Sequence, residues 1–352
     1  MKVLISGQGF AGSLLAWFLI KNGCEVTIVD SGDPFSSTRV SAGIMLPVTG
    51  RRLAKTQNAD VIIPFARELY YDIEKVTNTH FFSSKNVLQL FTSTANRNEW
   101  YARSADPGMQ AYIGEIVNSE QMHHSIKGDC GGILLNQSGS VNPLLFQDAI
   151  KKYVIEHGTF IHDVFNFEQL EVTNTHVLWK SNNYSCVVFC EGYRALTDGH
   201  FNYLPFKPAK GEILDFYSEE LSDANIIVKG NYILPMGNNR FRIGSTYEWE
   251  NLNCDISVEA AKELETNLTS LLNCDYKIID QKAGIRPSVR DRRPLLGFHP
   301  KFKTVAIFNG LGTKGAMQGP FYAKQMAHLI LSGENPDPDV SIKRFESLYQ
   351  GH

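Results

Sequence analysis

The 352-residue sequence contains no apolar run long enough to span a bilayer, so a membrane-spanning protein is not expected. It has no large excess of charge either, because 34 Lys and Arg stand against 37 Asp and Glu, for a formal net charge of −3. This balance argues against the broad basic surface of a nucleic-acid-binding protein. The six cysteines lack metal-ligand spacing, so no metal site is expected, and no Ser/His/Asp set or nucleophilic cysteine is recognisable. The remaining composition is that of an ordinary globular enzyme with about two domains.

Two further features bear on the compartment. The first residues lead straight into an apolar run that the predicted fold needs, so we expect no cleavable signal. Cys186 and Cys190 lie four residues apart in an apolar predicted strand, hence on one face, and we expect buried thiols rather than a redox pair. Both expectations fit a reducing, cytoplasmic location.

The most informative stretch is the first thirty residues. An apolar run at 2–6 is followed by a glycine-rich turn at 7–12, a helical pattern that stops at 22–23, a second apolar run at 25–29, and Asp30. Strand, glycine turn, helix, strand and acid in this order are typical of the βαβ unit that binds dinucleotides. A chance glycine cluster in a tight turn is the alternative, but it would not bring the other parts with it.

Each part of this unit has a physical task. Gly7 allows the sharp turn out of the strand, Gly9 allows a pyrophosphate close to the backbone, and Gly12 allows the helix to lie close to the sheet. The free N–H groups at the helix start attract the phosphate charge, and the Asp30 carboxylate can accept hydrogen bonds from ribose hydroxyls. The expected cofactor contacts here are Gly7, Gly9, Phe10, Ala11, Gly12, Asp30 and Ser31. The unit alone leaves NAD and FAD open.

A long polar stretch at 31–55 follows the unit. Loops of this length inside a compact domain usually have a function. Arg39 and Ser41 could meet phosphate or ribose, and Ala42 and Gly43 are small enough for a flat ring to approach. The alternative is a surface loop whose arginines are solvated.

A second strand–glycine loop–helix pattern lies near the other end of the chain. An apolar run at 304–309 leads into the glycine-rich loop 310–315, and a helix is expected from near residue 318 to 333. Two such loops at opposite ends suggest one extended ligand that touches both, which favours FAD over a nicotinamide cofactor. The N–H groups of 312–315 could stabilise the negative charge that appears on a reduced flavin. A loop that only connects strand and helix is the alternative.

The intervening segments predict a second, different domain. Helices are expected at 59–76, 99–111, 143–158 and 257–272. Strands are expected at 86–91, 131–135, 159–164, 168–180 (as a hairpin), 184–190, 210–216, 224–228, 232–235 and 240–244, with a hairpin turn at 238–239. We predict an α/β protein with a Rossmann-like FAD-binding domain and a second α+β substrate domain on an antiparallel or mixed sheet. The first would comprise residues 1–78, 140–200 and 283–350, and the second residues 79–139 and 201–282.

The glycine-rich and arginine-containing blocks resemble those of the D-amino acid oxidase superfamily of FAD-dependent oxidoreductases, which includes glycine oxidase and sarcosine oxidase. The resemblance rests on 7–12 with Asp30, on 39–43, on the Gly-Ile-Arg-Pro and Asp-Arg-Arg-Pro blocks at 284–287 and 291–294, and on 310–315. It covers nearly the whole chain and is specific to the superfamily, not to a substrate. It implies transfer of a hydride from the carbon beside an amine to flavin N5, hydrolysis of the imine, and reoxidation by O2 in the oxidases.

The resemblance also implies roles for particular residues. Arg286 matches the arginine that takes the substrate carboxylate, with a structural salt bridge as the alternative role. Tyr232 matches an active-site tyrosine whose phenol could donate to that carboxylate, with simple aromatic packing as the alternative. Lys314 would add positive charge near the flavin or meet the substrate, and Met45 and Arg52 would line the same cavity. The further FAD contacts implied are Arg39, Ser41, Ala42, Gly43, Val164, Glu191, Gly192, Arg286, Gly310, Gly312, Thr313, Lys314 and Gly315, where Glu191 replaces the usual alanine or glycine.

The expected function is therefore oxidation of a C–N bond in a small carboxylate-bearing amine. The resemblance implies non-covalent FAD, because sarcosine oxidase-like members that link the flavin covalently use a cysteine near the C-terminal arginine block, and no cysteine follows Cys274 here. Three alternatives stay open: a dehydrogenase with another electron acceptor, an oxidoreductase that modifies a tRNA wobble uridine, and a flavin-binding protein without catalysis. The slight excess of acidic residues argues against tRNA as a substrate. So does the absence of the methyltransferase half that accompanies the tRNA-modifying domain of this superfamily. No nucleic-acid partner is therefore expected. Peroxide formation under air would separate oxidase from dehydrogenase.

Overall fold

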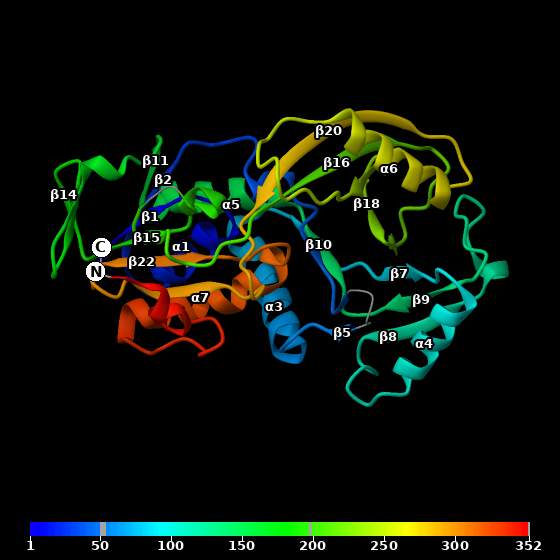
Figure 1. The fold of residues 1–352 in the computed structure, drawn as a ribbon, viewed down its shortest axis with the longest axis horizontal. Coiled ribbons are helices and arrows are strands. Elements are labelled where there is room, and N and C mark those ends of the chain that lie inside the picture. The colour runs from blue at the N-terminus through cyan, green and yellow to red at the C-terminus, as the bar shows by residue number, and fades with distance from the viewer. Residues whose placement is uncertain (50–53, 197–198, 351–352) are drawn as a thin grey trace.

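The computed structural model describes residues 1–49, 54–196 and 199–350, and its ribbon forms two lobes side by side (Figure 1). One lobe is built around a six-stranded sheet and the other around an eight-stranded sheet. Both the first and the last strands of the chain lie in the six-stranded sheet, so the chain leaves this lobe and returns to it. No helix among the described residues is long and apolar enough to cross a membrane.

The six-stranded sheet has the order β11-β2-β1-β15-β22-β21. Its strands are β11 (Thr159–His162), β2 (Glu25–Asp30), β1 (Lys2–Ser6), β15 (Cys186–Phe189), β22 (Val305–Asn309) and β21 (Leu295–Phe298). All neighbours are parallel except β21, which runs antiparallel to β22. The central strands are apolar along their length because helices and loops cover both faces. Cys186 and Cys190 are buried at the end of this sheet, as predicted.

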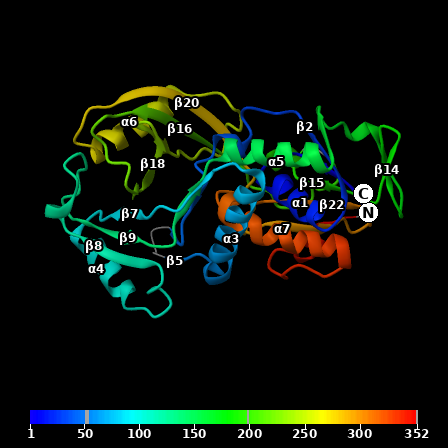
Figure 2. The same cartoon turned by 180° about the vertical axis from the view of Figure 1, so that it is seen from behind.

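Three helices pack together on this sheet. They are α1 (Phe10–Lys21), α5 (Pro143–His157) and α7 (Gly315–Ser332), and α1 lies between the other two (Figure 2). The predicted cap of α5 is present, since the Asn142 side chain accepts hydrogen bonds from the N–H groups of Leu144 and Leu145. Helix α3 (Ala59–Thr77) packs on α7 and buries Ala66, Leu69, Tyr70 and Ile73, as its periodicity predicts.

The eight-stranded sheet has the order β20-β16-β19-β18-β17-β7-β9-β8. Its strands are β20 (Lys277–Arg286), β16 (Ala209–Tyr217), β19 (Arg240–Gly244), β18 (Asn231–Gly237), β17 (Ile226–Lys229), β7 (Val87–Leu90), β9 (Gly132–Leu135) and β8 (Ile113–Val117). All pairs are antiparallel except β17 with β7. The predicted hairpin turn is confirmed, because Asn238 and Asn239 have φ of 52° and 57°. Helix α6 (Val258–Leu271) covers one face through the predicted Ala260, Leu264, Leu268 and Leu271.

Short elements connect the lobes and complete the chain. They are α2 (Ser37–Val40), β3 (Ile44–Met45), β4 (Val48–Thr49), β5 (Ala54–Lys55), β6 (Phe82–Ser83), β10 (Gly139–Val141), β12 (Leu170–Val172), β13 (Val177–Trp179) and β14 (Asn182–Tyr184). Strand β10 pairs with both β3 and β6. The stretch 31–55, predicted as one long loop, therefore contains several short elements.

Two predicted helix boundaries are wrong. The helix expected at 99–111 is α4 (Thr94–Ser104), which begins where the Ser93 side chain accepts a hydrogen bond from the Asn96 N–H. The last helix begins at Gly315 rather than near residue 318, so the glycine loop runs directly into the helix. The α/β class with two sheets is as predicted. We propose that residues 1–78, 140–200 and 283–350 form the FAD-binding domain and residues 79–139 and 201–282 the substrate domain. Strand β20 crosses the boundary between the two at 282–283.

Candidate functional site

The first glycine turn is a tight junction between β1 and α1. A Cβ at Gly12 would lie 1.9 Å from the Gly7 carbonyl oxygen, so any larger residue would push the helix away from the turn. A Cβ at Gly7, where φ is +96°, would lie 2.6 Å from the Cys190 carbonyl oxygen. Phe10 and Ala11 are the first two residues of helix α1. The N-cap residue is Gly9, which has no side chain to cap the helix.

Asp30 lies at the carboxyl end of β2 beside this turn. Its carboxylate accepts hydrogen bonds from the N–H groups of Gln8 and Gly32, each at 2.7 Å, and Ser31 follows it at the same edge. The neighbouring strand β11 ends close by, because the Asp163 N–H donates to the Asp30 carbonyl oxygen at 3.2 Å. Val164 comes next and has an exposed side chain. Asp30 and Val164 therefore lie at one edge of the sheet, as a shared adenosine site requires.

The loop after Asp30 lies over the glycine turn. The Thr38 hydroxyl accepts a hydrogen bond from the Phe10 N–H at 3.1 Å, which places the short helix α2 at the start of α1. The buried Ser36 hydroxyl has no hydrogen-bond partner among the described residues. A buried unpaired hydroxyl is rare, and a polar ligand at this turn would satisfy it.

The following residues of the loop carry the predicted Arg39–Gly43 block. Arg39 is half-buried and makes no ion pair within residues 1–49, 54–196 and 199–350. The Ser41 hydroxyl donates to the Thr38 carbonyl oxygen at 2.8 Å, and Ala42 is buried. Gly43 allows a close backbone approach, since a Cβ there would lie 2.0 Å from the Val141 carbonyl oxygen. Met45 is fully buried, and Arg52 lies outside the described residues.

The second glycine loop lies against the first. A Cβ at Gly315 would lie 3.2 Å from the Phe10 ring, so the starts of α7 and α1 are neighbours. The Asn309 side chain joins this loop to the Gly192 turn, because it donates to the Gly192 carbonyl oxygen at 2.9 Å and accepts from the Gly310 N–H at 2.8 Å. The structure thus brings both glycine blocks and Gly192 to one edge of the six-stranded sheet.

The start of α7 carries the other predicted cofactor contacts. Thr313 is exposed, and Lys314 is the N-cap residue, without a side-chain cap among the described residues. Burial and the nearby positive charge of Arg292 lower the pKa of Lys314, whose Nζ donates to the Thr56 hydroxyl at 3.3 Å. The Glu191 carboxylate points back to β1, where it accepts a hydrogen bond from the Ser6 hydroxyl.

These features fit a dinucleotide. Two helix starts lie side by side and neither N-cap residue caps its helix with its own side chain, a carboxylate stands at the end of β2, and a buried hydroxyl has no partner among the described residues. The helix N–H groups suit anionic oxygens, and the carboxylate suits ribose. The residues that would hold it are those of the two glycine blocks, Asp30 and the 36–43 loop. No group of three or more His, Cys, Asp or Glu among the described residues could hold a metal ion.

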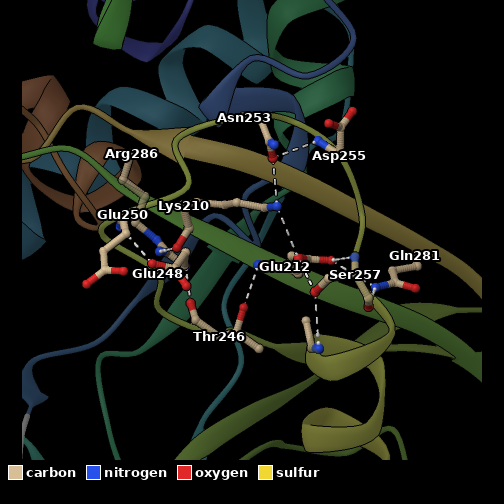
Figure 3. A network of polar contacts seen from close by, with 11 residues as sticks. Lys210, Glu212, Thr246, Glu248, Glu250, Asn253, Asp255, Ser257, Gln281 and Arg286 are labelled. Atoms are coloured by element: carbon tan, nitrogen blue, oxygen red, sulfur yellow. Dashed lines mark hydrogen bonds and ion pairs between the residues drawn. The ribbon is translucent and has the colours of Figure 1, made fainter.

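Arg286 lies at the end of β20 in the other lobe and is held by neutral oxygens (Figure 3). Its guanidinium donates to the Lys210 carbonyl at 3.2 Å, the Ser245 hydroxyl at 2.5 Å and the Thr246 carbonyl at 3.3 Å. The Tyr247 ring covers it at 4.4 Å. It forms no ion pair with any carboxylate in the described ranges, and burial lowers its pKa. A half-buried cation without a counter-ion attracts anions more strongly than an exposed one does.

Tyr232 faces the same place from β18. A Cβ at Gly244 would lie 2.8 Å from its hydroxyl oxygen, so the phenol lies across the neighbouring strand β19. Burial raises the pKa of Tyr232 to about 12, although the positive charges of Arg242 and Arg286 act in the opposite direction. The phenol is therefore a neutral hydrogen-bond donor at physiological pH. The structure brings together Arg286 and Tyr232, which are 54 positions apart in sequence but lie on one sheet face.

Sequence reasoning missed Arg242, which lies on the same face in β19. It is buried and forms a two-pronged ion pair with Asp215, at 2.6 and 2.9 Å. Burial would raise the pKa of Asp215, but Arg242 and Lys282 hold it below its ordinary value. The available signal was one charged residue between two apolar neighbours in each of two predicted strands, Asp215 between Leu214 and Phe216 and Arg242 between Phe241 and Ile243. Such residues are rarely buried unless paired.

Comparison with known proteins gives the same picture. A family model described as FAD dependent oxidoreductase matches residues 2–329. Glycine oxidase of Bacillus subtilis (strain 168) is 23% identical over 95% of this chain and 94% of its own. The tRNA 5-methylaminomethyl-2-thiouridine biosynthesis bifunctional protein MnmC of Legionella pneumophila (strain Corby) is 24% identical over 86% of this chain, which spans only 46% of that protein.

The fold is shared with solved structures. Iminodiacetate oxidase from Chelativorans sp. BNC1 superposes with a TM-score of 0.81 at 21% identity, over 97% of this chain and 98% of that chain. At this identity the similarity concerns the fold alone. The family match covers the glycine blocks, Asp30 and the Arg286 block together. The chain belongs to the D-amino acid oxidase family of FAD-dependent oxidoreductases and is an enzyme of that family.

Proposed function

We propose that the enzyme oxidises the C–N bond of a small amine or amino acid that carries a carboxylate, with O2 as electron acceptor. The observation that carries this proposal is the environment of Arg286. Its guanidinium has no carboxylate partner among the described residues and touches only neutral oxygens and one ring. A substrate carboxylate would supply the missing negative charge, and the planar guanidinium would fix its orientation.

The residues of this chain would act by binding and orientation. Arg286 would hold the carboxylate, and the neutral Tyr232 phenol would donate a hydrogen bond to it. Because both groups would bind the carboxylate, they would fix its position and limit the directions in which the adjacent C–H bond is presented, which is how positioning accelerates a reaction. Bound FAD supplies the acceptance of the hydride. The chain's N–H groups at the start of α7 would favour negative charge developing beside them.

We propose that FAD is bound without a covalent link. No cysteine follows Cys274 in the sequence. The arginine-containing blocks at 284–287 and 291–294 and the chain after them therefore offer no thiol for a covalent link. Heating the protein in acid and separating the chromophore from the polypeptide tests this. Release of all yellow colour into the supernatant supports the proposal, and colour that stays with the precipitated protein contradicts it.

The function is tested by supplying candidate substrates under air. Purified holoenzyme is incubated with amino acids, N-methyl amino acids, iminodiacetate and 2-hydroxy acids, and peroxide and the carbonyl product are quantified. We expect peroxide with a carboxylate-bearing amine and none with the 2-hydroxy acids. Product that forms only after an artificial electron acceptor is added, without peroxide, would mean that the electrons pass to an acceptor other than O2.

A second candidate is oxidation of an amine on a modified tRNA nucleoside. The similarity to the MnmC protein favours it, although this chain spans less than half of that protein. The test is the same assay with tRNA that carries the modified wobble uridine. Product from tRNA but not from free amines would replace the first proposal.

A further inference from the structure

Arg242 has more contacts than its ion pair with Asp215 requires. It lies in β19 directly opposite Asp215 of β16, on the sheet face away from α6, and is 5% exposed. Nε and Nη2 bind the two carboxylate oxygens. Nη1 points elsewhere and donates to the carbonyl oxygens of Val40 at 3.3 Å and Ser41 at 3.1 Å.

These two carbonyls belong to the other lobe. Val40 ends α2 and Ser41 follows it, in the loop that passes over the start of α1. Two residues earlier in the same loop, Thr38 accepts the hydrogen bond of the Phe10 N–H. A single guanidinium therefore connects the eight-stranded sheet to the turn that is built for the pyrophosphate.

Apolar packing alone does not orient this loop. It rests on β20 at Gly284, where a Cβ would lie 3.1 Å from Val40 Cβ and 3.4 Å from the Phe35 carbonyl oxygen. Such a contact resists compression but has no directional preference. The hydrogen bonds from Arg242 are directional and charge-assisted, so they favour one orientation of the Val40 and Ser41 carbonyls and add to the backbone hydrogen bonds that these residues make within the loop.

We propose that Arg242 is a positioning residue for FAD, which holds the loop of residues 36–43 in the conformation that binds the cofactor. Asp215 orients Arg242, and Arg242 orients the loop. The substrate-side sheet thereby contributes to the affinity for FAD, although its own strands do not form the dinucleotide cradle. The proposal concerns cofactor binding and stands whether or not the substrate carries a carboxylate.

The test separates this role from a purely structural one. Arg242→Met alone leaves the buried Asp215 with only the half-exposed Lys282 as partner, so the informative variant is Asp215→Leu/Arg242→Met, which removes both charges of the strand pair. Arg242→Lys keeps the charge but loses the fork and is a second variant that we expect to fold. Apoproteins are prepared, and FAD dissociation constants are measured by quenching of flavin fluorescence, alongside the thermal midpoint of each apoprotein.

We expect the double variant to keep a thermal midpoint near that of the wild-type apoprotein and to bind FAD about ten- to a hundredfold more weakly. We expect Arg242→Lys to weaken FAD binding in the same direction. Trypsin cleavage after Arg39 should be faster in both variants than in wild-type apoprotein, because the loop is released. Wild-type FAD affinity in a folded variant would overturn the proposal.

Glu212→Gln is the matched control. Glu212 is buried in β16, the strand of Asp215, but on the opposite face of the sheet. There it accepts hydrogen bonds from Ser257 and Gln281 (Figure 3). We expect this variant to lower the thermal midpoint of the apoprotein while its FAD affinity and its cleavage after Arg39 stay unchanged. Equal loss of FAD affinity in Glu212→Gln would assign the effect to general destabilisation and would overturn the specific role of Arg242.

Discussion

Two arginines on one sheet face show how the environment of a residue decides its role. Arg242 is neutralised by Asp215, whereas Arg286 touches only neutral groups within the described structure. A paired guanidinium has its charge satisfied and can serve to hold other parts of the chain. An unpaired guanidinium retains its attraction for an anion, and partial burial strengthens that attraction because the local dielectric constant is lower than that of water. This difference is why substrate binding is assigned to Arg286.

Replacement of Arg286 by Ala should remove recognition of the substrate carboxylate. We expect kcat/KM for a carboxylate-bearing amine to fall. The fall should correspond to a loss of about 2–5 kcal/mol of transition-state stabilisation, because a buried charge pair is lost. FAD should stay bound, as judged from the flavin absorbance of the purified variant. The same amine without its carboxylate is the control, and Arg286→Ala should leave its slow oxidation unchanged. Unaltered kinetics with the carboxylate-bearing substrate would remove Arg286 from the site.

Replacement of Tyr232 by Phe should have a smaller effect. One hydrogen bond from a neutral phenol is lost, so we expect about 1–2 kcal/mol, seen mainly in KM. Since burial raises the pKa of Tyr232 to about 12, the phenol keeps its proton throughout the neutral and mildly alkaline range. The kcat/KM profiles of wild type and Tyr232→Phe should therefore be parallel between pH 7 and about 10. A wild-type inflection in this range that vanishes in Tyr232→Phe would contradict the assignment.

Residue-scale predictions from sequence succeeded where a residue belongs to a local block. Asp30 could be placed because it closes a strand at a fixed distance from the glycines. Arg242 could not, since its partner Asp215 and the carbonyls that it binds come from distant parts of the chain. Likewise the positions of α5 that meet the core could not be chosen in advance, since Leu145 is 42% exposed while its neighbour Phe146 is buried. Which side of α5 meets the core depends on α1 and β2, and these contacts are not encoded locally.

At the scale of elements, the glycine turns determine where two helices begin. Helix α1 starts at Phe10 and α7 at Gly315, and each start is adjacent to the other. The sequence predicts α6 and α3 well because one apolar stripe faces one partner. It misplaces α4, a polar helix with a single buried residue, Trp100, because few apolar positions mark its ends. It also misplaces the start of α7, where the glycines of the loop continue into the helix.

Gly12→Ala should separate α1 from its turn. The new Cβ would lie 1.9 Å from the Gly7 carbonyl oxygen, so the backbone must shift. We expect loss of FAD binding in the purified protein, with destabilisation of about 1–3 kcal/mol from the overpacked junction. The flavin-to-protein absorbance ratio and a thermal melt measure the two effects.

Gly23→Asn is the matched control for this change. Gly23 closes the same helix with φ of +75°, and a Cβ there meets no atom of the described chain within 4 Å. Asparagine tolerates this backbone conformation better than other residues. The control should keep its flavin and nearly all its stability. Full flavin content in Gly12→Ala would show that the turn does not form the cradle.

At the scale of the whole molecule, the two ends of the chain meet in one sheet and enclose a segment that forms another. Strands β1 and β22 flank β15, so the two glycine turns emerge at one edge. The sequence predicts this return because both blocks have the same strand–loop–helix pattern. It cannot predict the lateral order of the strands, which depends on pairings between distant segments, such as Leu4 with Val187 and Val187 with Val305.

His299 should make the stability of the folded chain depend on pH. Burial lowers the pKa of His299 to about 4, and its Nδ1 accepts hydrogen bonds from the N–H groups of Lys301 and Phe302, which requires the neutral ring. The unfolded chain therefore binds this proton first as pH falls from about 6.5. The contribution is complete above pH 6.5 and is lost as pH falls toward 4, by about 3 kcal/mol.

His299→Asn tests this expectation, since its side-chain oxygen can accept the same hydrogen bonds without titrating. Urea unfolding at pH 7, 6, 5 and 4.5 should show a free energy of unfolding that falls less steeply in the variant than in the wild type. Parallel curves would mean that His299 titrates normally in the folded chain.

We propose that one FAD spans both glycine turns. Its reactive side would face a substrate whose carboxylate is held by Arg286. The most direct measurement is the rate at which the bound flavin loses its absorbance without oxygen, first with an N-methyl amino acid and then with the same amine lacking the carboxylate. We predict rapid bleaching by the acid and bleaching by the plain amine slower by at least about a hundredfold. Equal rates for the two compounds, or a protein that binds no FAD, would contradict it.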